Sequence, residues 1–235
     1  MRNPLTATRR RAGLARDDHR VVYQVASLCL GYPDDDLLAR LPLLAAALDE
    51  QPASASATAL RRVVDHLTGV DPAVARQNYV DVFDLTRRHT LYLTYWSDGD
   101  TRRRGTSLGG FKQRYRDSGF LVDTHGELPD YLPMVLEFAA RVDPATGHTM
   151  LVENRPALEL IRMALDERHS PYADVLTAIC ATLPGASPAD KATALSLATA
   201  GPATESVGLE PGGRKLLPLY TSNDDSADRL GPIRW

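Results

Sequence analysis

Apolar residues recur every three or four positions through most of this chain, and each such run predicts an amphipathic helix. The first two runs consist of Val21, Val22, Val25, Leu28 and Cys29, and of Leu37, Leu38, Leu41, Leu44 and Leu48. Further runs lie in residues 54–67, 71–85, 101–119, 132–139, 156–165 and 170–183, with a last short helix after residue 187. Each apolar stripe must be covered by another element, so the pattern predicts helices packed on helices.

Residues that favour helix starts precede many of these runs. Asp18, Asp34 and Thr101 can each accept a backbone N–H from the first turn of the helix that follows. Three further starts place proline directly after a capping residue: Asp71-Pro72, Ser170-Pro171 and Ser187-Pro188. Proline presets φ for the first helical position, so these pairs support the helical interpretation.

The segment 91–96 is ambiguous, because its residues could alternate as a β-strand. A single strand is unstable without a partner, and the sequence shows no second strand and no Asn-Gly hairpin turn. We therefore predict helix in this segment and an all-α fold for the chain.

The two ends of the chain differ from its middle. Residues 1–16 are rich in arginine and threonine without apolar periodicity, so we expect a flexible basic arm. Residues 200–235 are rich in Gly, Pro and Ser with few large apolar side chains, so we expect a disordered tail. Residues 17–199 are predicted to form a single compact multi-helix domain.

Composition narrows the functional classes. Hydrophobic residues make up 43% of the chain, which is enough for a core, and the formal net charge of -3 argues against nucleic-acid binding. Cys29 and Cys180 have no CxxC neighbour, so buried free thiols are expected. No run approaches the roughly 18 apolar residues that cross a bilayer. No apolar signal segment follows the arginines at positions 9–11, so we predict a cytoplasmic protein without membrane insertion.

Charge is clustered in the middle of the chain. Residues 87–116 contain eight basic and two acidic side chains, whereas residues 117–153 contain seven acidic and one basic. Such blocks can neutralise each other on neighbouring helices, or they can form a recognition surface. Because successive helical residues lie about 100° apart, Arg102, Arg103 and Arg104 cannot all face inward.

An acidic pair, Glu127 and Asp130, precedes the apolar run at 132–139. Asp130 can cap that helix, and the pair can instead hold the basic end of a bound peptide. An alternative function is a small helical metal- or nucleotide-dependent phosphohydrolase that uses His89, His125 and this pair. The sequence offers it no HExxH zinc motif, no GxSxG nucleophile and no GxxxxGK[ST] phosphate loop. We therefore predict no catalytic residue, no metal ligand and no cofactor.

Four ordered segments carry a family resemblance. They are YVDVFD at 79–84, HTLYLTY at 89–95, GDTRRRG at 99–105 and ELPDYLPMVLEF at 127–138. Together they resemble the NarJ-type nitrate reductase molybdenum cofactor assembly chaperones, and the likeness extends roughly over residues 23–183. Relatives often have histidine after the Glu-x-Pro-Asp element, where this chain has Tyr131.

The resemblance implies an all-helical chaperone that binds the apo form of the catalytic (alpha) subunit of respiratory nitrate reductase, mainly through its N-terminal segment. It implies support for molybdenum cofactor insertion and complex assembly, without a place in the finished enzyme. A chaperone for a different molybdoenzyme has the same sequence features. The expected contacts are a groove of Tyr79, Phe83, Tyr92, Trp96, Tyr131 and Leu132, with a polar rim of Arg102, Arg104, Glu127 and Asp130. For the apolar residues, core packing is the alternative.

Overall fold

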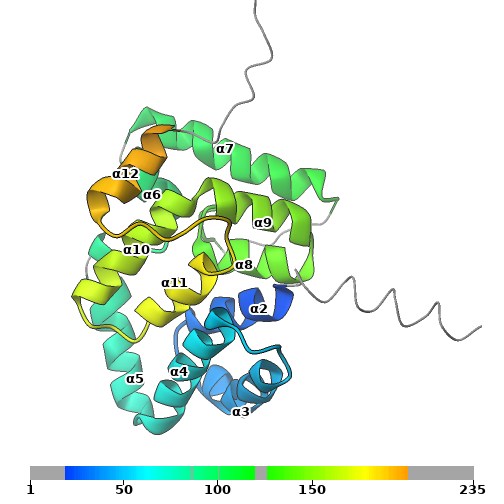
Figure 1. Ribbon diagram of the computed structural model, residues 1–235, viewed down its shortest axis with the longest axis vertical. Coiled ribbons are helices and arrows are strands. Elements are labelled where there is room, and N and C mark those ends of the chain that lie inside the picture. Colours follow the sequence, from blue (N-terminus) through cyan, green and yellow to red (C-terminus); the bar gives the residue numbers. More distant parts are fainter. Residues whose placement is uncertain (1–18, 86, 100, 120–125, 201–235) are drawn as a thin grey trace, which may run out of the picture. The chain divides into compact units, whose positions relative to one another are not determined.

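The computed structural model describes residues 19–85, 87–99, 101–119 and 126–200 (Figure 1). Its α-helices are α2 (Arg20–Cys29), α3 (Asp35–Asp49), α4 (Ala55–Gly69), α5 (Pro72–Tyr79), α6 (Leu93–Asp98), α7 (Arg102–Asp117), α8 (Leu132–Arg141), α9 (Pro144–Glu153), α10 (Arg155–Glu167), α11 (Ala173–Cys180) and α12 (Lys191–Ala200). A π-helix (Val80–Asp84) and a 3-10 helix (Arg87–His89) lie between α5 and α6. The all-α prediction is confirmed for the described residues, in which an isolated bridge between Tyr92 and Tyr131 is the β pairing present.

Polar side chains start several helices where the sequence predicts them. Asp34, Ser54 and Asp71 each accept a first-turn backbone N–H, at 2.8, 3.1 and 2.8 Å. A cap of this kind stabilises a helix by about 1 kcal/mol. Thr101 stands at the start of α7, but its hydroxyl donates to the carbonyl of Asp98 at 2.9 Å and makes no cap.

The helix α9 was absent from the predicted runs. Its start carries the same signal as residues 71–72, because Asp143 accepts a first-turn N–H at 3.0 Å and Pro144 occupies the first turn. Gly147 lies so close to α8 that an added Cβ would come within 2.4 Å of the Cα of Ala139. Glycine at this position therefore permits α8 and α9 to pack closely.

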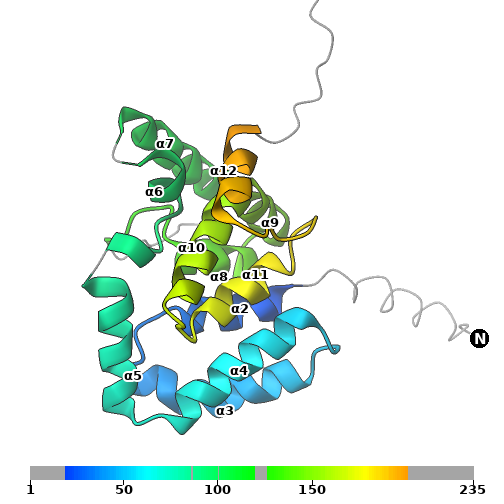
Figure 2. The ribbon, with the colours of Figure 1, turned by 60° about the vertical axis from the view of Figure 1, so that its left-hand side comes forward.

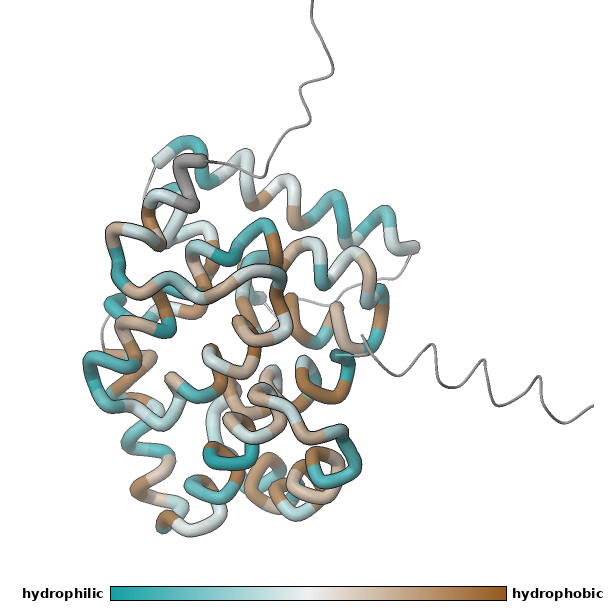
Figure 3. Tube along the Cα trace, viewed as in Figure 1, coloured by the Kyte–Doolittle hydropathy of each residue, from teal (hydrophilic) through white to brown (hydrophobic). Residues whose placement is uncertain are grey.

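The helix α2 lies among the other helices rather than at their edge (Figures 1 and 2). It packs most extensively on α8 and also contacts α3, α4 and α11. Its side chains Tyr23, Ala26 and Cys29 are at most 2% exposed. Figure 3 shows hydrophobic residues recurring between hydrophilic ones along the helices, as expected when each helix buries one face.

The segment that was ambiguous in the sequence combines both interpretations. Leu91 and Tyr92 are extended, and α6 begins only at Leu93. Leu93 N–H donates to the carbonyl of Asp130 at 3.2 Å, and Leu132 N–H donates to the carbonyl of Leu91 at 2.9 Å. The prediction of helix is thus wrong for Leu91 and Tyr92, which pair with the residues preceding α8.

Residues 19–200 fall within one compact unit of the chain. The predicted arm, the predicted cap Asp18 and the tail beyond Ala200 lie outside the described residues. Both cysteines are buried free thiols, as predicted, and burial raises the pKa of Cys29 to about 12. Across the described part of the chain, each helix is too short or too polar to cross a membrane.

Candidate peptide-binding groove

Asp130 caps the start of α6, although it lies far from that helix in the sequence. Its Oδ2 accepts hydrogen bonds from the Thr94 backbone N–H at 2.9 Å and from the Thr94 hydroxyl at 2.6 Å. Thr94 is the second residue of α6, so Asp130 caps that helix rather than α8, whose preceding residue Tyr131 makes no side-chain cap. Asp130 is 0% exposed, which corrects the prediction that it lies on a polar rim.

Arg104 extends this contact toward the surface. Its Nε donates to the Thr94 hydroxyl oxygen at 3.1 Å, and its guanidinium carbon lies 6.0 Å from the centre of the Tyr95 ring. Arg104 is half-buried, whereas Arg102 and Arg103 are exposed. The three consecutive arginines therefore divide as helical spacing requires, with one turned inward.

A pocket of about 620 Å³ opens beside this anchor, and we call it the Leu85 pocket. It is lined by Phe83, Asp84, Leu85, Arg87, Thr90, Tyr92, Tyr95, Arg104 and Leu128. Leu85 is 67% exposed and Leu128 is 39% exposed, although both are large apolar side chains. Phe83 is held from behind by the rings of Tyr79 and Tyr172, at centroid distances of 4.9 and 5.0 Å. The pocket thus combines two leucines accessible to solvent with a phenylalanine that packs on two further rings.

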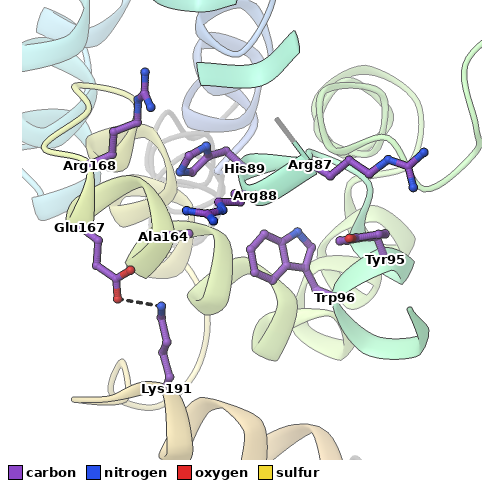
Figure 4. Close-up of a pocket in the computed structure, with 9 residues that line it drawn as sticks. All are labelled: Arg87, Arg88, His89, Tyr95, Trp96, Ala164, Glu167, Arg168 and Lys191. Atoms are coloured by element: carbon purple, nitrogen blue, oxygen red, sulfur yellow. Dashed lines mark ion pairs between the residues drawn. The ribbon is translucent and has the colours of Figure 1, made fainter. Parts of the chain in front are cut away.

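A second pocket of about 830 Å³ adjoins the first, and we call it the Trp96 pocket (Figure 4). It is lined by Arg87, Arg88, His89, Tyr95, Trp96, Ala164, Glu167, Arg168 and Lys191. Arg87 and Tyr95 line both pockets, so the two pockets are neighbours, and together we call them the groove. The Trp96 indole N–H donates to the carbonyl of Thr90 at 2.9 Å, which fixes the ring in the pocket.

Two tyrosines of this region, Tyr92 and Tyr131, have raised pKa values. Burial raises the pKa of Tyr92, and the hydrogen bond and negative charge of Glu127 raise it further. Tyr92 donates this hydrogen bond to an oxygen of the exposed Glu127 carboxylate. Burial also raises the pKa of Tyr131, whose ring centre lies 5.4 Å from that of Tyr92. Glu127 is therefore held at the edge of the groove by a neutral phenol.

The structure divides the ten predicted contact residues into three groups. Phe83, Tyr92 and Arg104 line the Leu85 pocket, Trp96 lines the Trp96 pocket, and Glu127 is bonded beside them. Tyr79, Asp130 and Leu132 are buried, and Tyr131 is half-buried against the core. Arg102 is exposed and lines neither pocket.

Several lining residues were not predicted. Leu85 directly follows the segment at 79–84, and Leu128 lies within the segment at 127–138, so their positions in or beside the motifs were a usable signal for them. Arg168 and Lys191 come from the end of α10 and the start of α12, which join the groove only when the chain folds. No local pattern links these two residues to residues 83–104.

The residues of the alternative phosphohydrolase do not form a metal site in the described part of the chain. His89 is buried, with its Nδ1 3.1 Å from the carbonyl oxygen of Val82, and Asp130 is buried under Thr94. His125 lies outside the described residues. Among those described, no three His, Cys, Asp or Glu side chains are placed to hold a metal ion together.

Comparison with known proteins places this fold and groove in a family. Residues 47–178 match the family model described as the nitrate reductase delta subunit. This range contains all ten predicted contact residues. The Bacillus subtilis protein assigned as nitrate reductase molybdenum cofactor assembly chaperone NarJ is 31% identical over 166 residues, which cover 71% of this chain and 90% of that protein.

The chain belongs to the nitrate reductase delta subunit family. NarJ of Escherichia coli K12, named as a nitrate reductase molybdenum cofactor assembly chaperone, is 30% identical over 63% of this chain and 64% of its own length. The nitrate reductase-like protein NarX of Mycobacterium tuberculosis H37Rv is 44% identical over 69% of this chain. The chain spans only 24% of that NarX sequence.

A solved structure shows the same fold as this family member. A crystal structure of a candidate redox enzyme maturation protein from Archaeoglobus fulgidus superposes with a TM-score of 0.53 at 20% sequence identity. The match covers 68% of this chain and 91% of that one. At this identity the likeness concerns the helical fold alone.

Proposed function

We propose that this chain is a system-specific assembly chaperone of the cytoplasm that binds the apo catalytic subunit of respiratory nitrate reductase. It binds mainly the N-terminal segment of that subunit, which lies in the groove, and it supports insertion of the molybdenum cofactor and assembly of the complex. It is not part of the finished enzyme. Membership of the family and the names of the Bacillus and Escherichia relatives support this role.

The observation that carries the proposal is the exposure of Leu85 and Leu128 at one pocket. Exposed apolar side chains that gather at one hollow are typical of a binding site, whereas single ones are common on any surface. An amphipathic segment can lay its apolar face across these leucines, with Phe83 beneath. Covering a fully exposed leucine side chain contributes roughly 1.5–3 kcal/mol. Because Leu85 is 67% and Leu128 39% exposed, covering both contributes roughly 2–3 kcal/mol, which is a part of the roughly 8 kcal/mol of a micromolar affinity.

Polar groups at the edge of the groove can fix the orientation of the segment. Glu127 is exposed, and its bond from Tyr92 holds the carboxylate where a basic side chain of the partner can reach it. Arg104 lies across the same pocket, tied to Thr94. Binding of this kind needs neither a catalytic group nor a cofactor in the chaperone, and charged edges favour one partner and one direction.

The proposal can be tested with overlapping synthetic peptides from the N-terminal segment of a nitrate reductase catalytic subunit, titrated into the full chain by calorimetry. Leu85→Asp should weaken the best peptide at least tenfold, because it places a charge under the apolar face. Leu43→Asp is a matched control, since Leu43 has the same 67% exposure as Leu85 but lies on α3 and lines neither pocket of the groove.

Thermal stability should be nearly unchanged in both variants, because each side chain is mostly exposed. The proposal is wrong if no peptide from the catalytic subunit binds, or if the two variants bind equally well. Tighter binding of peptides from the catalytic subunit of another molybdoenzyme would assign the same groove to that enzyme instead.

A further inference from the structure

The Trp96 pocket gathers basic side chains from three separate elements. Arg87 and Arg88 come from the 3-10 helix, Arg168 from the residue after α10, and Lys191 from the first residue of α12. Glu167 is the one acidic side chain among the lining residues described, and it pairs with Lys191 at 2.7 Å. Four basic side chains against one acidic leave a surplus of three positive charges around the hollow, which attracts anions.

The interior of this pocket suits a polypeptide rather than a bare ion. The half-buried Trp96 ring lies between Arg88 and Tyr95, and Ala164 on α10 contributes only a methyl group (Figure 4). The indole presents an apolar face to the hollow because its N–H is already bonded to Thr90. A volume of about 830 Å³ is enough for several side chains. The pocket thus offers an apolar surface with basic groups around it.

Charge is unevenly distributed along the groove. The Leu85 pocket is lined by Arg87, Arg104 and Asp84, with Glu127 bonded at its edge, so its charges nearly balance. The Trp96 pocket has four basic side chains against one acidic, and the pockets meet at Arg87 and Tyr95. A segment that leaves the Leu85 pocket at this junction enters a strongly basic hollow.

We propose that the bound segment places its apolar side chains in the Leu85 pocket and a cluster of aspartate or glutamate side chains in the Trp96 pocket. This inference rests on the proposed function, because it assigns the second half of the same groove to the same partner chain. It defines the chemistry of the partner segment, which has an apolar stretch with an acidic stretch at only one of its two ends. Arginine forks bind carboxylates in paired hydrogen bonds, which gives the acidic stretch a defined position.

The test uses three designed peptides with one shared amphipathic leucine-containing core. The first carries a run of aspartates after the core, the second carries asparagines in their place, and the third carries the aspartates before the core. Fluorescence anisotropy with the full chain should show that one of the two aspartate peptides binds about tenfold more tightly than the asparagine peptide at low salt. This gain in affinity should shrink as the salt concentration rises. The opposite order should gain much less.

Variants assign this gain to the pocket. Arg168→Glu should weaken the aspartate peptide far more than the asparagine peptide, so that the advantage of the aspartates is lost. Arg141→Glu is the matched control, because Arg141 is also an exposed arginine at the end of a helix, α8, but lines neither pocket of the groove. Leu85→Asp should weaken all peptides that share the core, whatever their charges.

The possible failures are distinguishable. If the asparagine peptide binds and the aspartates add nothing in either order, the acidic partner is excluded while the proposed function stands. The same holds if Arg168→Glu and Arg141→Glu reduce the gain equally. If inorganic phosphate at modest concentration abolishes the gain and is bound with equal strength in the absence of peptide, the pocket takes a free anion, and the inference is overturned. If no peptide binds and Leu85→Asp has no effect, the proposed function itself fails.

Discussion

The contact between Asp130 and Thr94 gives a sharp prediction, because it links the interior of the fold to the groove. Asp130→Ala removes two hydrogen bonds to a buried carboxylate and leaves the Thr94 N–H and hydroxyl without that acceptor. Hydrogen bonds to charged groups contribute about 1.5–3 kcal/mol each, and relief of the buried charge returns part of this. We expect the free energy of unfolding to fall by about 2–4 kcal/mol, measured by urea denaturation.

Asp130→Asn keeps one oxygen that can accept both hydrogen bonds, so it should be less destabilising than alanine. Glu127→Ala is the contrasting variant, because Glu127 is exposed and should cost less than about 1 kcal/mol. Peptide affinity should also fall in Asp130→Ala, since α6 carries Tyr95 and Trp96. If Asp130→Ala unfolds within about 0.5 kcal/mol of the natural chain, the anchoring role assigned to this carboxylate is refuted.

Three further outcomes follow from the same structure. Gly147→Ala should lower the melting temperature clearly, because the added Cβ would come within 2.4 Å of Ala139. Gly109→Ala should instead raise the free energy of unfolding by about 0.5–1 kcal/mol, because no atom lies within 4 Å of the added Cβ. Equal melting temperatures of the two variants would contradict this packing. Cys29 and Cys180 should not react with a thiol reagent at pH 8 until the chain unfolds, because burial raises the pKa of both thiols; rapid native labelling would show otherwise. Burial raises the pKa of Tyr23 to about 12, so the folded state keeps a proton that the unfolded state loses above about pH 10. Stability to urea should therefore fall between pH 10 and pH 12, and a flat profile there would contradict the burial of this phenol.

The helices could largely be predicted because helical periodicity and capping are local. Asp34 and Asp71 accept the expected N–H groups within three residues of their own position. The helix α9 was missed because its apolar stripe is weak, although Asp143-Pro144 marked its start. The pairing of Tyr92 with Tyr131 joins positions far apart in the sequence, and no local pattern contains that information.

For the candidate site too, local patterns identify single residues but not which distant residues come together. Phe83, Tyr92 and Trp96 could be selected because they lie in the motifs that carry the family resemblance. The prediction for Asp130 was wrong because an aspartate before a helix normally caps that helix. Here its carboxylate instead accepts a hydrogen bond from Thr94 on another helix. Arg168 follows α10, far along the chain from residues 83–104, so its place in the groove required the structure.

The central claim is that the catalytic subunit of nitrate reductase lies in the groove, and site-specific photo-crosslinking tests it directly. A photoreactive phenylalanine at Leu128, at the edge of the Leu85 pocket, is compared with one at Leu43 on α3, in cells that produce the apo catalytic subunit. We expect a crosslink from position 128 to the N-terminal segment of that subunit and none from position 43. Equal crosslinking from both positions, or none from position 128 while the subunit still copurifies with the chain, would contradict it.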